Sequence, residues 1–300
     1  MSIIGSNDSF SMAINGLYDI CGMNDMILIE CPDEVGLVTN ITRILAWHKL
    51  NIVAMREFVD EHAKRFFTRI ECSGEIGNAS LLENELLEHL PADARVTIVP
   101  HREKSLAVLV TKEFHCLAET LIRDHFKTLG GHVKCVIGNY DTLKDFTEKL
   151  GVPFHYISHE GKTKEVFEQE MLDVLKTYEP DYLVLAKFMR ILSPGFISYF
   201  PNRIINIHHS FLPAFIGANP YRQAFERGVK LLGATAHFVT NSLDEGPIIT
   251  QMTNHVNHTF TVKGMVVAGR EIEKAVLSKA LEQVLQGRVF VSGNKTIVFD

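Results

Sequence analysis

Two hydrophobic periods alternate along the first hundred residues. Apolar or alternating runs at residues 26–31, 51–60, 65–72 and 95–99 have the pattern of strands, and two segments between them have helical spacing. The order β-α-β-β-α-β is that of the split βαβ, or ferredoxin-like, unit, which we expect over residues 25–100. Residues 1–24 have no clear periodicity and are expected to form a flexible lead-in. The helical positions are Val35, Val38, Ile41, Ile44 and Leu45, then Leu81, Leu82, Leu86, Leu87 and Leu90.

A longer alternation of strands and helices follows the polar link His101–Lys104. It predicts a Rossmann-like α/β domain with a parallel, doubly wound sheet over residues 101–300. A hairpin around Ser292-Gly293-Asn294 is expected to close the chain. Strands are predicted at 105–111, 133–138, 154–158, 182–187, from 204, 234–240 and 248–256. Helices are predicted at 116–129, 142–150, 162–178, 194–200, 221–227 and 262–285.

Composition narrows the function classes. The 300 residues are 46% hydrophobic with a net charge of −6, so the chain has no basic footprint for nucleic acid. No apolar run is long enough to span a membrane, and no secretory signal is expected. Five cysteines without CxxC spacing favour a reducing cytoplasm over a disulfide framework or zinc site. No HExxH or similar ligand spacing is present, so we expect no metal.

The run from Ile204 to Pro213 carries the first candidate chemistry. Asn206 and His208 share one face of the predicted strand, and Ile207 and His209 take the other. Polar groups at a strand end lie where open α/β sheets bind ligands. A loop with Asp244 follows a later strand, although an Asp in such a turn is more often a turn residue than a catalyst.

These segments together resemble the folate-dependent formyltransferases, in which an Asn, a His and an Asp form the catalytic set. The resemblance rests on residues 203–217, the string 240–251 and the ending Gly293–Thr296. It assigns catalysis to Asn206, His208 and Asp244. An amide N–H stabilises a tetrahedral oxyanion, and an imidazole stabilises the oxyanion and moves a proton to the leaving nitrogen. A carboxylate beside an imidazole favours the charged ring, so Asp244 is expected to hold His208 charged.

The resemblance also implies a substrate site. The turn after the strand at 182–187 receives the pterin ring in this family, and Arg190 is placed to meet a carboxylate of the folate tail. His237 matches a family site histidine, whereas we interpret His209 as structural. Lys187, Arg190 and Asn219 differ from the residues usual in the family. The expected substrate-binding residues are Met189, Arg190, Ile191, Leu192, His237, Thr240 and Asn241.

The N-terminal unit resembles the ACT domains that bind amino acids and regulate metabolic enzymes. Its first strand enters a helix through a turn with Asp33 and Gly36, and Asn51 follows the helix. Glycine permits close approach of a ligand, and a helix N-terminus offers free N–H groups. These three residues are candidates for an amino-acid effector site. The alternative is a tight connection with oligomerisation through sheet edges, and we expect a homo-oligomer, dimer or tetramer.

The first turn of the second domain separates transfer from hydrolysis. Formyltransferases that act on a ribonucleotide carry a glycine-rich, phosphate-cradling loop there. Residues 111–117 contain no glycine, and Glu113 would repel a phosphate. We therefore expect water as acceptor, giving hydrolysis of 10-formyltetrahydrofolate to formate and tetrahydrofolate without metal or redox cofactor. Such a reaction would balance one-carbon pools and supply formate for purine synthesis. The alternatives are transfer to a non-phosphate acceptor and a non-catalytic, ACT-regulated folate sensor.

Overall fold

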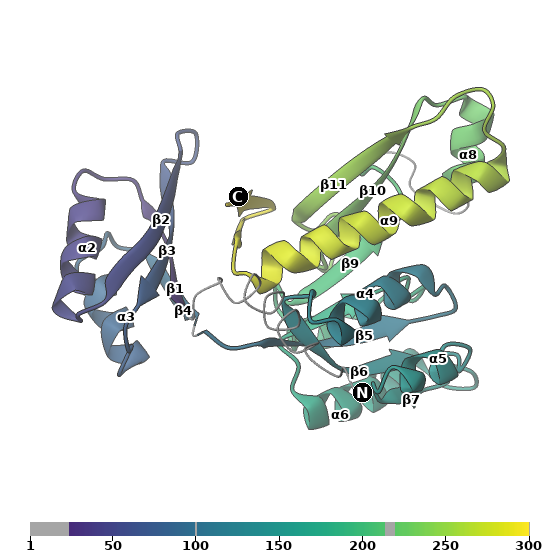
Figure 1. The fold of residues 1–300 in the computed structure, drawn as a ribbon, viewed down its shortest axis with the longest axis horizontal. Helices are drawn as coiled ribbons and strands as arrows, with labels where there is room; N and C mark the ends of the chain where they lie inside the picture. Colours follow the sequence, from purple (N-terminus) through teal and green to yellow (C-terminus); the bar gives the residue numbers. More distant parts are fainter. Residues whose placement is uncertain (1–23, 100, 214–219, 300) are drawn as a thin grey trace, which may run out of the picture. The chain divides into compact units, whose positions relative to one another are not determined.

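The computed structural model describes residues 24–99, 101–213 and 220–299. The chain divides into two compact units between Arg102 and Glu103, and each is described by itself (Figure 1). The lead-in predicted for residues 1–24 lies outside the described residues up to position 23. No helix in the described ranges is long and apolar enough to cross a membrane.

The N-terminal unit has the predicted β-α-β-β-α-β order. Its four strands form an antiparallel sheet in the order β2-β3-β1-β4. Both helices bury their apolar sides on one core, which contains Ile27, Ile41 and Leu82. This arrangement confirms the ferredoxin-like, ACT-type fold class. The elements are β1 (Asp25–Pro32), α2 (Leu37–Trp47), β2 (Asn51–Asp60), β3 (Arg65–Ser73), α3 (Ala79–Glu88) and β4 (Arg95–Val99).

The first helix begins later than its apolar spacing predicts. Gly36 adopts a left-handed conformation with φ 96° just before α2, so Val35 lies in the turn and is fully exposed. Leu37 takes the buried position, while Val38 is largely exposed. The prediction that Val35 belongs to the helix is therefore wrong. Leu81 of α3 is likewise exposed, and Leu82 is buried in its place.

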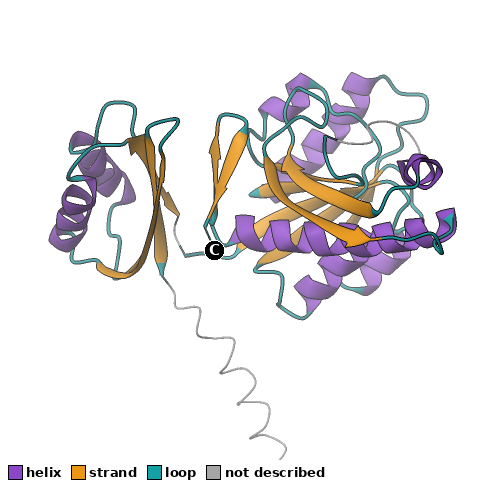
Figure 2. Cartoon of the chain, turned by 90° about the horizontal axis from the view of Figure 1, so that it is seen from above, coloured by secondary structure: helices purple, strands orange, loops and turns teal. Residues whose placement is uncertain are grey.

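The C-terminal unit is built on a seven-stranded sheet in the order β11-β10-β9-β8-β5-β6-β7, with a separate hairpin. The helices lie on both faces of this sheet (Figure 2). Strands β5 to β9 are β5 (Lys104–Val110), β6 (Gly131–Gly138), β7 (Phe154–Tyr156), β8 (Tyr182–Leu185) and β9 (Ile204–His208). The later strands are β10 (Leu231–Phe238), β11 (Ile248–His255), β12 (Val289–Ser292) and β13 (Lys295–Val298). The helices are α4 (His115–His125), α5 (Lys144–Lys149), α6 (Lys164–Tyr178), α7 (Pro194–Ser198), α8 (Pro220–Arg227) and α9 (Val262–Leu285).

The sheet is mixed rather than wholly parallel. Neighbours from β7 to β9 run parallel, which confirms the doubly wound core, but β10 pairs antiparallel with both β9 and β11. Helix α9 packs over β10 and β11 in a core that it shares with α4. Helices α6 and α7 cover the other face.

The chain reverses its direction of winding between β5 and β8. It builds β6 and β7 on one side of β5 and then returns to build β8 and β9 on the other. Open α/β sheets bind ligands at the carboxyl ends of the strands beside such a switch point. The ends of β8 and β9 therefore mark the expected location of the site.

Candidate active site

One cavity of about 330 Å³ opens at these strand ends. Three segments line it: the end of β8 with the turn after it, the end of β9, and the loop after β10. The cavity brings together all three predicted catalytic residues and all seven predicted substrate-binding residues. Its lining includes Asn206, His208 and Asp244, together with Met189, Arg190, Ile191, Leu192, His237, Thr240 and Asn241.

Asn206 and His237 meet because they are direct partners across two antiparallel strands. Opposed residues in such a pair project to the same face of the sheet. The Nδ1–H of His237 donates to the Phe238 carbonyl at 2.9 Å, and burial lowers the pKa of His237, so the ring is neutral. Its Nε2 then accepts a hydrogen bond from Nδ2 of Asn206 at 3.1 Å. This bond fixes which end of the Asn206 amide carries the N–H groups in the cavity.

His208 and Asp244 form the second pair of the site. Nδ1 of His208 lies 3.3 Å from Oδ1 of Asp244. The hydrogen bond from His208 lowers the pKa of Asp244 below its ordinary value, so the carboxylate is ionised. The other ring nitrogen of His208, Nε2, is buried and makes no hydrogen bond within the described residues. It is the atom of this ring that remains for a reacting group.

The Asp244 loop is held against β10 by a close backbone approach at Gly246. A Cβ at this position would lie 1.8 Å from the Phe238 carbonyl oxygen, so only glycine fits. The Phe238 N–H also donates to the Pro247 carbonyl at 2.9 Å. Asp244 itself has φ 57°, a left-handed conformation that Asp tolerates better than most residues. The close approach at Gly246 therefore explains both the glycine in this turn and the position of the Asp244 carboxylate.

Two side chains hold the turn that follows β8 through hydrogen bonds to its backbone. The Met189 N–H donates to the Thr111 hydroxyl at 2.9 Å, which joins this turn to the end of β5. The buried carboxylate of Glu168 accepts from the Ser193 N–H at 2.7 Å. Met189 and Ile191 are more than 60% exposed, so they present apolar surface at the cavity mouth. These side chains offer apolar surface against which a flat aromatic ring can pack.

His209 does not turn away from His208 as the strand alternation predicts. The two rings are stacked, with centroids 4.9 Å apart and planes 16° from parallel, and both line the cavity. Strand β9 ends at His208, so the period of two no longer applies at the next residue. The prediction of opposite faces is wrong at this position.

A buried polar network behind the cavity was not anticipated from the sequence. Glu273 of α9 is 1% exposed, and its carboxylate contacts His115 Nε2 at 2.7 Å, Lys187 Nζ at 3.2 Å and the Tyr221 hydroxyl. Burial alone would raise the pKa of Glu273, but these hydrogen bonds and the Lys187 charge lower it to about 2. The sequence signal for this network was the acidic Glu273 next to Ile272, an apolar residue that is buried in α9.

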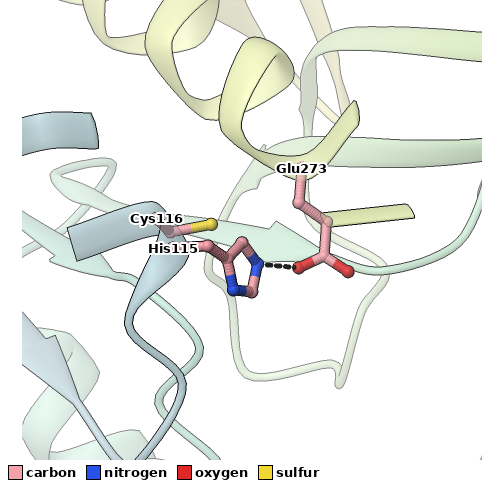
Figure 3. Close-up of side chains that lie close together, drawn as sticks. All are labelled: His115, Cys116 and Glu273. Carbon is pink, nitrogen blue, oxygen red and sulfur yellow. Dashed lines mark hydrogen bonds and ion pairs between the residues drawn. The ribbon is translucent and has the colours of Figure 1, made fainter. Parts of the chain in front are cut away.

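Within the described residues, one group of three side chains has atoms close enough to hold a metal ion: His115, Cys116 and Glu273 (Figure 3). Two observations disfavour that use. The ammonium of Lys187 already compensates the carboxylate, and burial raises the pKa of the Cys116 thiol far above its ordinary value. A thiolate is the metal-binding form. The donor set suits hydrogen bonding better than a cation.

An ion pair joins the loop that lacks glycine to α9. Glu113 contacts Arg270 Nη2 at 2.7 Å, and His115 is buried against Glu273. The charge of Glu113 is thus paired within the protein. The expectation that this loop repels an acceptor phosphate stays a prediction.

The structure does not bring the three effector candidates together, because the strand registers place Asp33 and Asn51 at opposite ends of the N-terminal sheet. Asp33 and Gly36 lie in the β1–α2 turn, and Asn51 begins β2. The Asp33 N–H donates to the Lys64 carbonyl, and the Asn51 amide donates to the Ser73 hydroxyl at 3.4 Å. Asn219, whose departure from the family pattern was noted, lies outside the described residues.

The mixed sheet, the switch-point cavity and the Asn-His-Asp set define a folate-type formyl transferase domain. A family model described as formyl transferase matches residues 104–281. The formyltetrahydrofolate deformylase of Escherichia coli (strain K12) is 52% identical over 268 residues, covering 89% of this chain and 95% of that protein. The Haemophilus influenzae deformylase is 47% identical over 273 residues, covering 91% and 98%. The chain belongs to the formyltetrahydrofolate deformylase family.

A solved structure extends this likeness over both units. The crystal structure of a formyltetrahydrofolate deformylase from Pseudomonas syringae pv. tomato matches with a TM-score of 0.89 at 36% identity. The match covers 98% of this chain and 100% of that chain. The order of an ACT-type unit followed by a formyl transferase unit is therefore shared with a family member.

Proposed function

We propose that the protein hydrolyses 10-formyltetrahydrofolate to formate and tetrahydrofolate. The observation that carries the proposal is the convergence of Asn206, His208 and Asp244 on one cavity at the switch point of the sheet. The family membership supports the same reaction.

Catalysis is proposed to rest on stabilising the tetrahedral intermediate. Water attacks the formyl carbon, and the carbonyl oxygen becomes an oxyanion. The Asn206 amide, held in orientation by His237, donates to that oxygen. His208, paired with Asp244 through Nδ1, is proposed to add a second donor through Nε2 and then to give a proton to the departing N10. The products are formate and the secondary amine of tetrahydrofolate.

The pterin is proposed to bind in the turn after β8, between the exposed apolar side chains of Met189 and Ile191. Arg190 lies in the same turn, and its guanidinium provides a cation for a carboxylate of the folate tail. We propose that Thr240 and Asn241 contact the substrate from the loop after β10. The reaction needs no redox cofactor, because the carbon keeps its oxidation state. The donors named above supply the electrophilic assistance that a metal would otherwise give.

Water is proposed as the acceptor because the acceptor side of the site is occupied by protein groups. Glu113 pairs with Arg270, and His115 pairs with Glu273, where a phosphorylated acceptor would need free donors. The decisive assay is incubation with 10-formyltetrahydrofolate and no amine. Stoichiometric formate release supports hydrolysis, whereas turnover only after addition of an amine would establish a transferase. Binding without any turnover would establish a folate sensor.

We propose that the N-terminal unit binds an amino-acid effector near Asp33 and Gly36, at the end of the sheet opposite to Asn51, and assembles the chain into a dimer or tetramer. The left-handed Gly36 before α2 and the open edge strand β2 support these two roles respectively. A thermal-shift screen with single amino acids tests the first role, with Gly36→Val as the variant that should lose any shift. Sedimentation velocity tests the second, and a monomer at micromolar concentration would contradict it.

A further inference from the structure

The stacked pair His208–His209 shares its cavity with two opposite charges. Asp244 lies 3.3 Å from Nδ1 of His208. Lys187 extends from the turn after β8, lines the same cavity and acts on His209 through its charge. Two chemically identical rings are thus placed in contrasting fields. Pairs of titratable groups held in contrasting environments are the usual mark of an acid and a base.

Lys187 is held in place by a buried carboxylate. Its side chain is only 10% exposed, and its ammonium lies 3.2 Å from the carboxylate of Glu273. That carboxylate is in turn held by His115 and Tyr221. The backbone of Lys187 has φ 61°, an uncommon conformation for a residue with a side chain, and such residues cluster at functional sites.

His209 has the accessibility and the charge state that a base requires. Its ring is partly buried and makes no hydrogen bond to another side chain within the described ranges of the chain. Burial, Lys187 and His208 lower the pKa of His209 to about 4. The carboxylates of Glu273 and Asp244 oppose this effect, and the Tyr221 ring, 6.2 Å away, is the other titratable group in contact. The ring is neutral at physiological pH.

We propose that His209 is the general base of the hydrolysis and that Lys187 is its positioning residue. Neutral water is a much weaker nucleophile than an amine, so hydrolysis depends more strongly on a base that takes a proton from the attacking group. The stacked pair provides one ring for each proton transfer. His208 donates a proton to N10, and His209 accepts a proton from water.

The proton balance of the step is complete. The water oxygen forms a bond to the formyl carbon while one water proton moves to His209, and the carbonyl π electrons become the oxyanion. When the intermediate collapses, the C–N10 bond breaks and N10 takes the proton of His208. The second water proton leaves with the nascent formic acid and is lost to solvent as formate forms. His209 returns its proton to solvent, and His208 takes one up.

This inference rests on the proposed hydrolysis, and the tests separate the two. His209→Asn and His209→Ala should lower kcat by about 100-fold, the scale of general-base catalysis, with KM within about threefold of wild type. Exogenous imidazole should raise the rate of the His209→Ala variant about tenfold. His258→Asn, at an exposed histidine of the same unit, should match wild type. A wild-type protein that releases no formate would refute the hydrolysis itself, whereas His209 variants as active as His258→Asn would refute only the role of His209.

A pH profile distinguishes a base from a packing residue. The substrate for this assay is 10-formyl-5,8-dideazafolate, which has no N5 and does not cyclise in acid. Lys187→Met removes the cation, so the pKa of His209 rises and the acidic limb of kcat/KM should move up by about one pH unit or more. Lys187→Arg keeps the charge, and its limb should stay in place. An unchanged limb in folded Lys187→Met would overturn the proposal, whatever the His209 variants do.

Discussion

Replacing Asp244 with Asn tests the link between the carboxylate and His208. The variant keeps the size of the side chain but removes its charge. In the wild type, the carboxylate lies 3.3 Å from Nδ1 of His208 and is only 19% exposed. Coulomb's law at an effective dielectric of about 20 gives about 5 kcal/mol for unit charges at this separation. Partial exposure reduces this to about 3 kcal/mol, which corresponds to about a 100-fold fall in kcat.

Formate release and folate binding are measured separately in this experiment. The Asp244→Asn variant should lose kcat while its Kd for a non-reactive folate stays within about threefold, because the turn after β8, where the pterin is proposed to bind, is untouched. Glu245→Gln is the matched control, since it removes an exposed charge one residue further along the chain and should match wild type. An Asp244→Asn variant with kcat near that of Glu245→Gln would refute the catalytic role of the pair. Equal losses of turnover and binding would refute the division between catalysis and substrate binding.

Three further variants test the geometry. Asn206→Ala removes the proposed oxyanion donor and should lower kcat by about 100- to 1,000-fold in the formate assay. Gly246→Ala forces the Asp244 loop off the Phe238 carbonyl and should lower kcat at least tenfold, whereas Gly264→Ala, with only ordinary contacts, should leave it unchanged. Glu273→Gln should lower the free energy of unfolding, measured by urea denaturation, by about 3 kcal/mol at pH 7. Because the folded-state pKa is depressed, that difference is fully present above about pH 4.5 and shrinks as pH falls toward 2; a difference that grows in acid would contradict the account.

Local patterns in the sequence were sufficient for the elements and for most of the site. Period and turn chemistry predict β2, β4 and α9 with the bounds that the structure has. Asn206 and His208 lie at the end of a strand, and Asp244 lies in a loop that contains a glycine. Both segments contribute to one cavity, together with the turn after β8. The family resemblance was needed to assign Asp244 to the same site as Asn206 and His208, because spacing alone indicated only a turn residue.

Long-range relations were beyond the local patterns. The antiparallel direction of β10, which brings His237 opposite Asn206, depends on how the chain returns through α8 and is not encoded in strand periodicity. The stacking of His209 depends on where β9 ends. The Glu273 network joins residues from α4, α8, α9 and the turn after β8, and no single segment of the sequence contains its pattern.

The central claim is that the Asn206–His208–Asp244 site transfers a formyl group to water. The most direct measurement follows 10-formyltetrahydrofolate in ¹⁸O-enriched water with no amine present, quantifying tetrahydrofolate and formate together. Hydrolysis at this site should give equal amounts of both products, with one solvent oxygen in each formate. Tetrahydrofolate without labelled formate, or no turnover until an amine is added, would contradict it.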